Sequence, residues 1–167
     1  MTTRSDAPHC RAGKTLILGL GNTILTDDGV GIYVVREIRR LGFHPQIDVE
    51  EAAAGGLELL DLLYGYERAI LIDAVPLKAT PPGGWIRLTP EDLGGGSAMA
   101  RHQVAFTEAL ALGRHSGMDL PCSIVIYGVQ PSDVTTFSES PTPEVAGAVA
   151  PLAQAIWRDA IETFRTP

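Results

Sequence analysis

Three short and nearly continuous apolar runs along the chain predict buried strands. They are 15–20 (TLILGL), 69–75 (AILIDAV) and 124–129 (IVIYGV). Runs that are apolar at nearly every position, rather than at alternate ones, are typical of strands covered on both faces. Two weaker segments complete the predicted sheet. Residues 46–50 form a short strand, and residues 84–88, with prolines on both sides, form an edge strand.

Between these runs the apolar positions recur at the spacing of a helix. From Gly29 onward one helical face carries four apolar residues: Val30, Val34, Ile38 and Leu41. This pattern predicts a helix that packs against the sheet. Residues 57–63 and 103–112 show shorter patterns of the same kind, and the segment 89–99, with three consecutive glycines, predicts a loop.

The last helix has a clear start signal. Thr142 can cap it, Pro143 suits its first position, and Glu144 complements the positive end of the helix dipole. Apolar and small residues then recur as far as Phe164. Pro151 lies inside this pattern and predicts a kink rather than a break, because its ring presses on the carbonyl four residues earlier.

The resulting order, β-α-β-α-β-β-α-β-α, predicts a three-layer α/β/α sandwich around a mostly parallel twisted sheet, with an edge strand free to run antiparallel. Residues 14–167 form one domain, and residues 1–13 form a flexible N-terminal tail without periodicity. Folds of this class bind ligands at the carboxyl ends of their strands. Residues that carry chemistry are therefore expected at those ends.

The charge and composition of the chain argue against several classes of binding partner and cellular location. The chain has 167 residues, 13 Lys and Arg against 20 Asp and Glu, and a net charge of −7. This balance argues against binding to nucleic acid or to an anionic membrane, where clustered positive charge supplies most of the affinity. The apolar runs are too short to cross a bilayer, the first dozen residues lack a secretory h-region, and two distant cysteines do not make a disulfide framework. These features favour a cytoplasmic protein.

The segment 19–31 (GLGNTILTDDGVG) connects the first strand to the first helix. It begins like a dinucleotide fingerprint, but Ile24 stands where the third glycine of GxGxxG belongs. One interpretation is a tight turn in which Asp27 or Asp28 caps the helix. Capping requires only one of these two carboxylates, so the other is available for a functional role.

Two further residues follow predicted strands or loops. Asp73 lies near the end of a buried strand, where a charge is costly unless it pairs or reaches a site, although it could also cap a turn before Pro76. His102 follows the glycine loop and precedes an apolar helix, whereas His9, His44 and His115 lie in polar segments. A lone histidine is more often structural than catalytic, so His102 gains weight only together with the carboxylates.

Two carboxylates and an imidazole from different loops can converge at one edge of a parallel sheet. Oxygen and nitrogen ligands of this kind suit a divalent ion such as nickel or zinc, with positions left open for water or a partner's ligand. The sequence has no GxSxG elbow, HExxH helix or Cys–His arrangement of known spacing. The residues alone therefore predict a metal-dependent hydrolase or a metal-recognition site.

At these residues the chain resembles the maturation endopeptidases of nickel-iron hydrogenases. The family's opening motif, GxGNxLxxD(D/E)GxG after a strand, is similar to 19–31 throughout, apart from Ile24 with Leu25 beside it. An aspartate and alanine that end an apolar strand, a histidine-glutamine pair at a helix start, and a late GVxP segment are matched at 73–74, 102–103 and 128–131. The similarity extends from Lys14 to the C-terminus.

The resemblance implies an endopeptidase that removes a C-terminal extension from the hydrogenase large-subunit precursor after nickel insertion. The family's metal-binding and catalytic positions correspond to Asp28, Asp73 and His102. In this picture nickel is supplied by the precursor and serves as the recognition element, and the isolated peptidase holds at most an adventitious divalent cation. The metal could act as a Lewis acid or activate water, with Asp27 or Glu51 assisting proton transfer. The family is classed as aspartic-type, although nothing here resembles the paired aspartates of pepsin.

One segment departs from the family pattern. Where the family has aspartate followed by Gly-Gly-Thr or Gly-Thr, residues 51–56 read EAAAGG, with Glu51 keeping the charge. Alanines restrict a loop that glycines would leave free, which concerns how the substrate tail is held. Two other functions stay open on the sequence: a nucleotide-binding α/β module, and a non-catalytic nickel-sensing scaffold that binds the precursor without cutting it.

Overall fold

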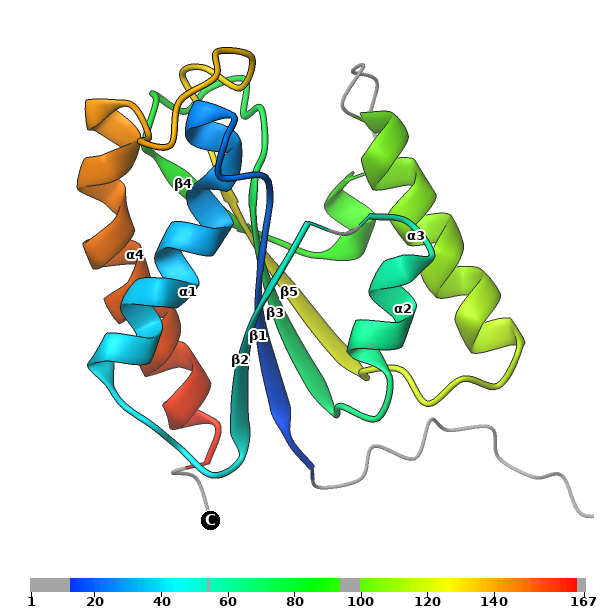
Figure 1. The fold of residues 1–167 in the computed structure, drawn as a ribbon. Coiled ribbons are helices and arrows are strands. Elements are labelled where there is room, and N and C mark those ends of the chain that lie inside the picture. Colours follow the sequence, from blue (N-terminus) through cyan, green and yellow to red (C-terminus); the bar gives the residue numbers. More distant parts are fainter. Residues whose placement is uncertain (1–12, 54, 94–99, 165–167) are drawn as a thin grey trace, which may run out of the picture.

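The computed structural model describes residues 13–53, 55–93 and 100–164, and within 100–105 it describes the backbone alone. A five-stranded sheet forms its centre, with the order β2-β1-β3-β5-β4 (Figure 1). The strands are β1 Thr15–Leu20, β2 Ile47–Ala52, β3 Arg68–Ala74, β4 Trp85–Leu88 and β5 Ser123–Val129. All neighbours pair in parallel except β4, which is antiparallel to β5 at the edge. The predicted architecture and the edge position of β4 are confirmed.

Helices cover both faces of the sheet. The helices α1 (Val30–Leu41) and α4 (Pro143–Glu162) lie together on one face, and α2 (Glu58–Leu63) and α3 (Ala100–His115) lie on the other (Figure 1). Successive side chains of a strand point to opposite faces, so each buried strand contributes side chains to the hydrophobic core on both faces of the sheet. On β3, Ile70 and Ile72 pack on the α1/α4 side, whereas Ala69 and Leu71 pack on the α2/α3 side.

The structure corrects several predicted details. The second strand continues to Ala52, and the third helix begins at Ala100, because backbone pairing and packing extend beyond the local signals. Leu41, expected on the buried face of α1, is 37% exposed because the helix ends there. Part of the predicted 89–99 loop forms a short 3-10 turn, η2 (Pro90–Leu93). Its glycines and the N-terminal tail up to residue 12 lie outside the described residues.

The helix start at Thr142 also differs from its prediction. Thr142 occupies the cap position of α4, but its side chain makes no capping hydrogen bond. Its hydroxyl instead donates to Asp27, which lies far away in the sequence. The helix continues through Pro151 as one element.

A close approach between α1 and the sheet explains the glycines of the segment 19–31. A Cβ added at Gly31 would lie 2.2 Å from the carbonyl oxygen of Ile72 and 2.4 Å from that of Leu20. A Cβ at Gly19 would lie 2.2 Å from the carbonyl oxygen of Gly31. Both contacts are with rigid backbone, so neither position has room for a side chain. The spacing of these glycines therefore serves helix–sheet packing.

This packing yields a first prediction. The variant Gly31→Ala should lose about 3 kcal/mol or more of unfolding free energy, because the new methyl group has no flexible neighbour to displace. Gly147→Ala is the matched control, because Gly147 is also helical and a Cβ there meets nothing within 4 Å. That control should gain about 0.5–1 kcal/mol from the better helix propensity of alanine. Urea unfolding measures both, and equal stability of the two variants would contradict the close packing.

Candidate active site

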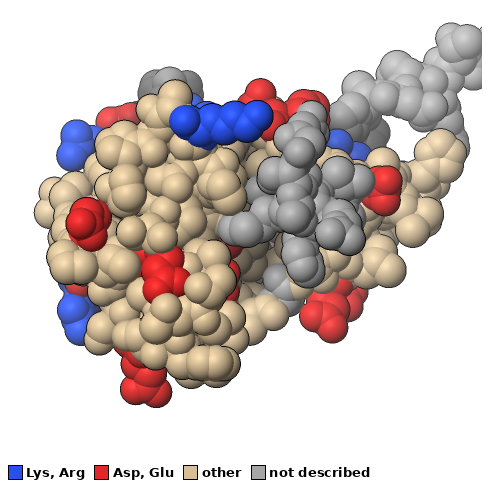
Figure 2. All heavy atoms as spheres, turned by 90° about the horizontal axis from the view of Figure 1, so that it is seen from above, with Lys and Arg blue, Asp and Glu red and all other residues tan. Residues whose placement is uncertain are grey.

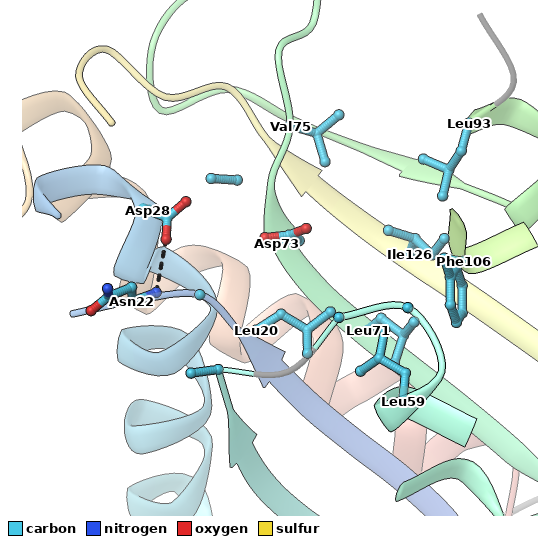
Figure 3. A pocket seen from close by; sticks show the side chains of 15 residues that line it. Leu20, Asn22, Asp28, Leu59, Leu71, Asp73, Val75, Leu93, Phe106 and Ile126 are labelled. Atoms are coloured by element: carbon cyan, nitrogen blue, oxygen red, sulfur yellow. Dashed lines mark hydrogen bonds between the residues drawn. The ribbon is translucent and has the colours of Figure 1, made fainter. Parts of the chain in front are cut away.

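A cavity of about 400 Å³ opens at the carboxyl edge of the sheet, on the α2/α3 side. Segments far apart in the sequence line it, as Figure 3 shows. They are the last residue of β1 and the loop after it, the second half of β3, the middle of β5, the loop after β2, and residues from α2, η2 and α3. The loop after β2, where the chain departs from the family pattern, contributes Ala53, Gly55 and Gly56. The predicted location of a site at the strand ends is thus matched by a cavity.

Asp28 and Asp73 both line this cavity. Asp28 belongs to a short 3-10 turn, η1 (Thr26–Gly29), and its Oδ2 accepts a hydrogen bond of 2.9 Å from the Asn22 backbone N–H (Figure 3). Gly21 makes the turn possible, because its φ of +129° is unfavourable for other residues and a Cβ would collide with the Asp28 carbonyl. Asp73 is the penultimate residue of β3.

The two carboxylates influence each other. The pKa of Asp73 is raised to about 7, chiefly by burial and also by the negative charge of Asp28, while the Ala74 backbone N–H opposes both effects. Among the described residues, no Lys or Arg forms an ion pair with either carboxylate. In the view onto this edge, the visible Lys and Arg side chains lie toward the margin (Figure 2). An unneutralised pair of oxygen donors in a cavity fits a divalent cation.

His102 lies near the start of α3, and its side chain is outside the described residues. Phe106, one turn further along the same helix, lines the cavity. At Phe106, α3 therefore borders the same cavity as the two carboxylates. Convergence of His102 with Asp28 and Asp73 on a common point stays a prediction.

Asp27 has a different position from its neighbour. Its side chain is fully buried and does not line the cavity. It accepts four hydrogen bonds: from the backbone N–H groups of Ser132 (2.8 Å), Asp133 (2.9 Å) and Thr142 (2.7 Å), and from the Thr142 hydroxyl (3.0 Å). These contacts favour a structural role, in which Asp27 ties the loop before α4 to η1, over assistance in proton transfer. Neither Asp27 nor Asp28 caps α1, whose cap residue is Gly29 and makes no side-chain capping bond.

Glu51 also lies away from the cavity. It forms ion pairs with Arg36, at 2.9 Å between Nη2 and Oε2, and with Arg39, both on α1. The hydrogen bond from Arg36 is the main reason that the pKa of Glu51 is lowered. The glutamate therefore faces the helix on the opposite side of the sheet from the cavity. The geometry therefore does not support a direct role for Glu51 in proton transfer at Asp73.

Sequence reasoning did not single out the apolar lining of the cavity. Leu59, Phe106 and Ile126 were assignable only as core residues, because their periodicity is that of ordinary packing, and Leu93 lay in the predicted loop 89–99. Asn22 was part of the glycine-rich segment, but its backbone N–H contact with Asp28 depends on the conformation of the turn. No local signal distinguishes such residues before the elements are brought together.

Comparison with known proteins bears on the chain as a whole. A family model described as hydrogenase maturation protease matches residues 32–159. The chain belongs to the hydrogenase maturation protease family.

Individual relatives agree with this assignment. The chain is 29% identical to the hydrogenase expression/formation protein HupD of Thiocapsa roseopersicina, over 83% of this chain and 63% of that protein. It is 26% identical to the hydrogenase 2 maturation protease of Escherichia coli (strain K12), over 72% of this chain and 75% of the relative. The structure of the hydrogenase maturating endopeptidase HybD from E. coli has the same fold, with a TM-score of 0.77, 23% identity, and coverage of 90% of this chain and 93% of that one. None of the helices in the described residues is long and apolar enough to span a membrane.

The raised pKa of Asp73 predicts how stability depends on pH in the metal-free protein. Between about pH 4 and pH 7 the folded chain holds a proton that the unfolded chain releases, so this group lowers stability as pH rises through that window. At pH 8, Asp73→Asn should be more stable than the wild type by up to about 4 kcal/mol and should lose this pH dependence. Urea unfolding across pH measures it.

A control separates the two causes of the shift. Asp28→Asn removes the neighbouring charge and should lower the pKa of Asp73 without restoring its ordinary value, because burial is the larger cause. Carbon-13 NMR of the Asp73 carboxyl reads the pKa directly. Titration of Asp73 near pH 4 in the wild type would contradict the raised pKa and its two causes, and unfolding of Asp73→Asn would indicate a structural pairing role instead.

The contacts of Asp27 predict a large effect on stability. In Asp27→Asn an amide nitrogen would replace an oxygen that accepts N–H donors, which should lower the unfolding free energy by about 2–4 kcal/mol. Asp28→Asn is the matched control, because the adjacent carboxylate accepts one backbone hydrogen bond (2.9 Å) and should lose about 1 kcal/mol or less. Equal urea midpoints for the two variants would refute the structural role of Asp27.

Proposed function

We propose that this chain is an endopeptidase that removes the C-terminal extension of a nickel-iron hydrogenase large-subunit precursor after nickel insertion, and that it recognises the nickel carried by the precursor. The carboxylate pair of Asp28 and Asp73 carries the proposal, since it lines a cavity and no cation partner is described for it. Membership of the maturation protease family supports the reaction, and the names of the relatives, which refer to hydrogenase formation, support the substrate.

In the proposed complex, Asp28, Asp73 and His102 hold the nickel of the precursor. Bound nickel supplies Lewis-acid chemistry that polarises a peptide carbonyl. The overall reaction adds water across the scissile bond, so that one product gains a carboxylate and the other an amine.

Residues of this chain orient the proposed nickel ligands before the precursor binds. The Asn22 backbone N–H orients the Asp28 carboxylate. Asp27 acts as a positioning residue, because it joins η1 to the loop before α4 and so limits movement of the neighbouring Asp28. Asp73, with its pKa raised to about 7, exchanges a proton near neutral pH, so an arriving cation competes with that proton for the Asp73 carboxylate.

The remaining parts of the proposal follow from the reaction. The aspartic-type, nickel-dependent class rests on two carboxylates and an imidazole rather than on a pepsin-like pair. The partner is the hydrogenase precursor rather than nucleic acid or a membrane, which agrees with the net charge of −7. A cytoplasmic location is proposed on the same grounds.

The proposal predicts a defined outcome in a processing assay. The purified chain should shorten a nickel-loaded large-subunit precursor by its C-terminal segment, as measured by mass spectrometry, and should leave the nickel-free precursor intact. His102→Ala and Asp73→Asn should abolish processing, because each removes a proposed ligand. The stability of His102→Ala should stay within about 1 kcal/mol of the wild type.

His115→Ala is the matched control, because His115 lies at the far end of the same helix and is exposed. It should process the precursor at the wild-type rate. Binding of the loaded precursor without release of a peptide would favour the non-catalytic scaffold. Equal processing of loaded and nickel-free precursor would refute recognition through nickel.

A further inference from the structure

Two large apolar side chains are exposed next to each other outside the cavity, on the α1/α4 side of the molecule. Ile24, in the turn before η1, is 47% exposed, and Phe137, in the loop between β5 and α4, is 79% exposed. The residues that follow them, Leu25 and Ser138, form a parallel β-bridge, so the two exposed side chains occupy neighbouring positions. Neither side chain lines the cavity. We call this pair the Ile24/Phe137 patch.

Hydrogen bonds hold the loop that carries Phe137 in a defined position. The buried Asp27 carboxylate accepts backbone N–H groups at both ends of the loop. The Tyr33 hydroxyl, on α1, donates to the backbone carbonyl of Glu139, two residues after Phe137, at 2.8 Å. A side chain on a fixed loop loses less conformational freedom when a partner covers it, so more of the contact energy appears as affinity.

Backbone strain at Thr26 accompanies this arrangement. Thr26 has a φ of +43°, in the left-handed region that β-branched residues rarely adopt. Its backbone N–H donates to the Ser138 carbonyl (3.0 Å), and its hydroxyl donates to the Thr136 carbonyl (2.6 Å). The strained residue therefore joins η1 to the residues on both sides of Phe137. Strain of this kind is concentrated at functional sites, where it fixes a geometry that the fold alone does not require.

The position of the Ile24/Phe137 patch indicates what covers it. The Asn22 side chain accepts the Ile24 backbone N–H (3.2 Å), and the Asn22 backbone N–H donates to the Asp28 carboxylate (2.9 Å). A single residue thus connects the patch to a carboxylate of the site. A folded protein that brings a metal ion to Asp28 is far larger than this separation, so its surface also lies over the patch.

The charge around the patch favours an apolar surface on the partner. Residues 22–26 and 134–138 contain no charged side chain, although the chain as a whole has a net charge of −7. In the view onto the carboxyl edge, the surface on the α1/α4 side is mostly uncharged (Figure 2). A charged group placed over the patch would lose its water without gaining a partner, whereas apolar groups would bury apolar surface.

We propose that the Ile24/Phe137 patch docks the folded part of the hydrogenase large-subunit precursor, through an apolar surface beside its metal centre. The inference rests on the proposed function and adds to it a second contact outside the site. The free energy of this contact comes from burial of apolar side chains and does not depend on nickel. The patch therefore contributes equally to binding of nickel-loaded and nickel-free precursor, and the carboxylates distinguish between the two.

Binding to purified precursor tests the patch. Phe137→Ser should raise the Kd of nickel-loaded and nickel-free precursor by the same factor, at least about tenfold, because aromatic anchors often dominate interfaces. Phe137→Leu keeps an apolar side chain and should weaken binding by a smaller factor. Phe43→Ser is the matched control, because Phe43 is 86% exposed in the loop between α1 and β2, at the opposite end of the sheet (Figure 1). It should leave both Kd values unchanged.

Two further measurements separate docking from other roles. In Phe137→Ser, KM for the nickel-loaded precursor should rise while kcat stays unchanged, because the patch does not contact the scissile bond. His102→Ala should instead weaken binding of the loaded precursor alone, because it removes a proposed nickel ligand. The urea midpoints of Phe137→Ser and Phe43→Ser should equal that of the wild type, since exposed side chains contribute little to stability.

The outcomes distinguish this inference from the function on which it rests. Equal affinity of the wild type, Phe137→Ser and Phe43→Ser for both precursors would overturn the docking surface and leave the peptidase function intact. A wild-type dimer that Phe137→Ser converts to a monomer, with unchanged affinity for the precursor, would also overturn it, because the patch would then bind a second copy of this chain. Binding that Phe137→Ser weakens, without cleavage by the wild type, would support the surface and refute the endopeptidase. Absence of both binding and cleavage would refute both.

Discussion

The close approach of α1 to the sheet at Gly31 is the constraint on which the site depends. With no side chain at this position, the helix backbone rests against the carbonyl oxygens of Leu20 and Ile72. Those carbonyls belong to the ends of β1 and β3, the two strands that lead into the carboxylates. The turn η1 precedes the helix directly, so the same contact determines where Asp28 lies relative to Asp73. The packing of α1 against the sheet therefore also determines the positions of the two acids relative to each other.

Four acidic residues near this edge lie in three different environments. Asp28 and Asp73 face a cavity without a described cation partner, which makes them available to a ligand. Asp27, next to Asp28 in the sequence, is buried and saturated with hydrogen bonds from the loop before α4. Glu51 is neutralised by arginines on the other face. The surroundings of each carboxylate therefore decide whether it is free to bind a ligand, holds a loop in place through hydrogen bonds, or forms an ion pair.

The two faces of the sheet are covered to different extents. On one side, α1 and α4 are long and pack closely against the strands. On the other, α2 has only six residues, and the described residues of α2, η2 and α3 leave a cavity over the strands. Leu20 of β1, Leu71 of β3 and Ile126 of β5 border this cavity. The short helix is what gives the carboxylates an apolar neighbourhood, and burial there is the main cause of the raised pKa of Asp73.

Much of this protein was determined by its sequence alone. Continuous apolar runs and helical spacing predicted the order of elements and the edge strand, because strand and helix periods are local properties of the chain. Asp28 and Asp73 were identifiable because acids that follow buried strands are costly and parallel strands end at one edge. The separation of Asp27 from Asp28, the pairing of Glu51 with α1, and the apolar cavity were decided only by the tertiary structure. The partners of Glu51 lie 12 and 15 residues away and those of Asp27 more than 100, and no period in the sequence records which side chains such segments bring into contact.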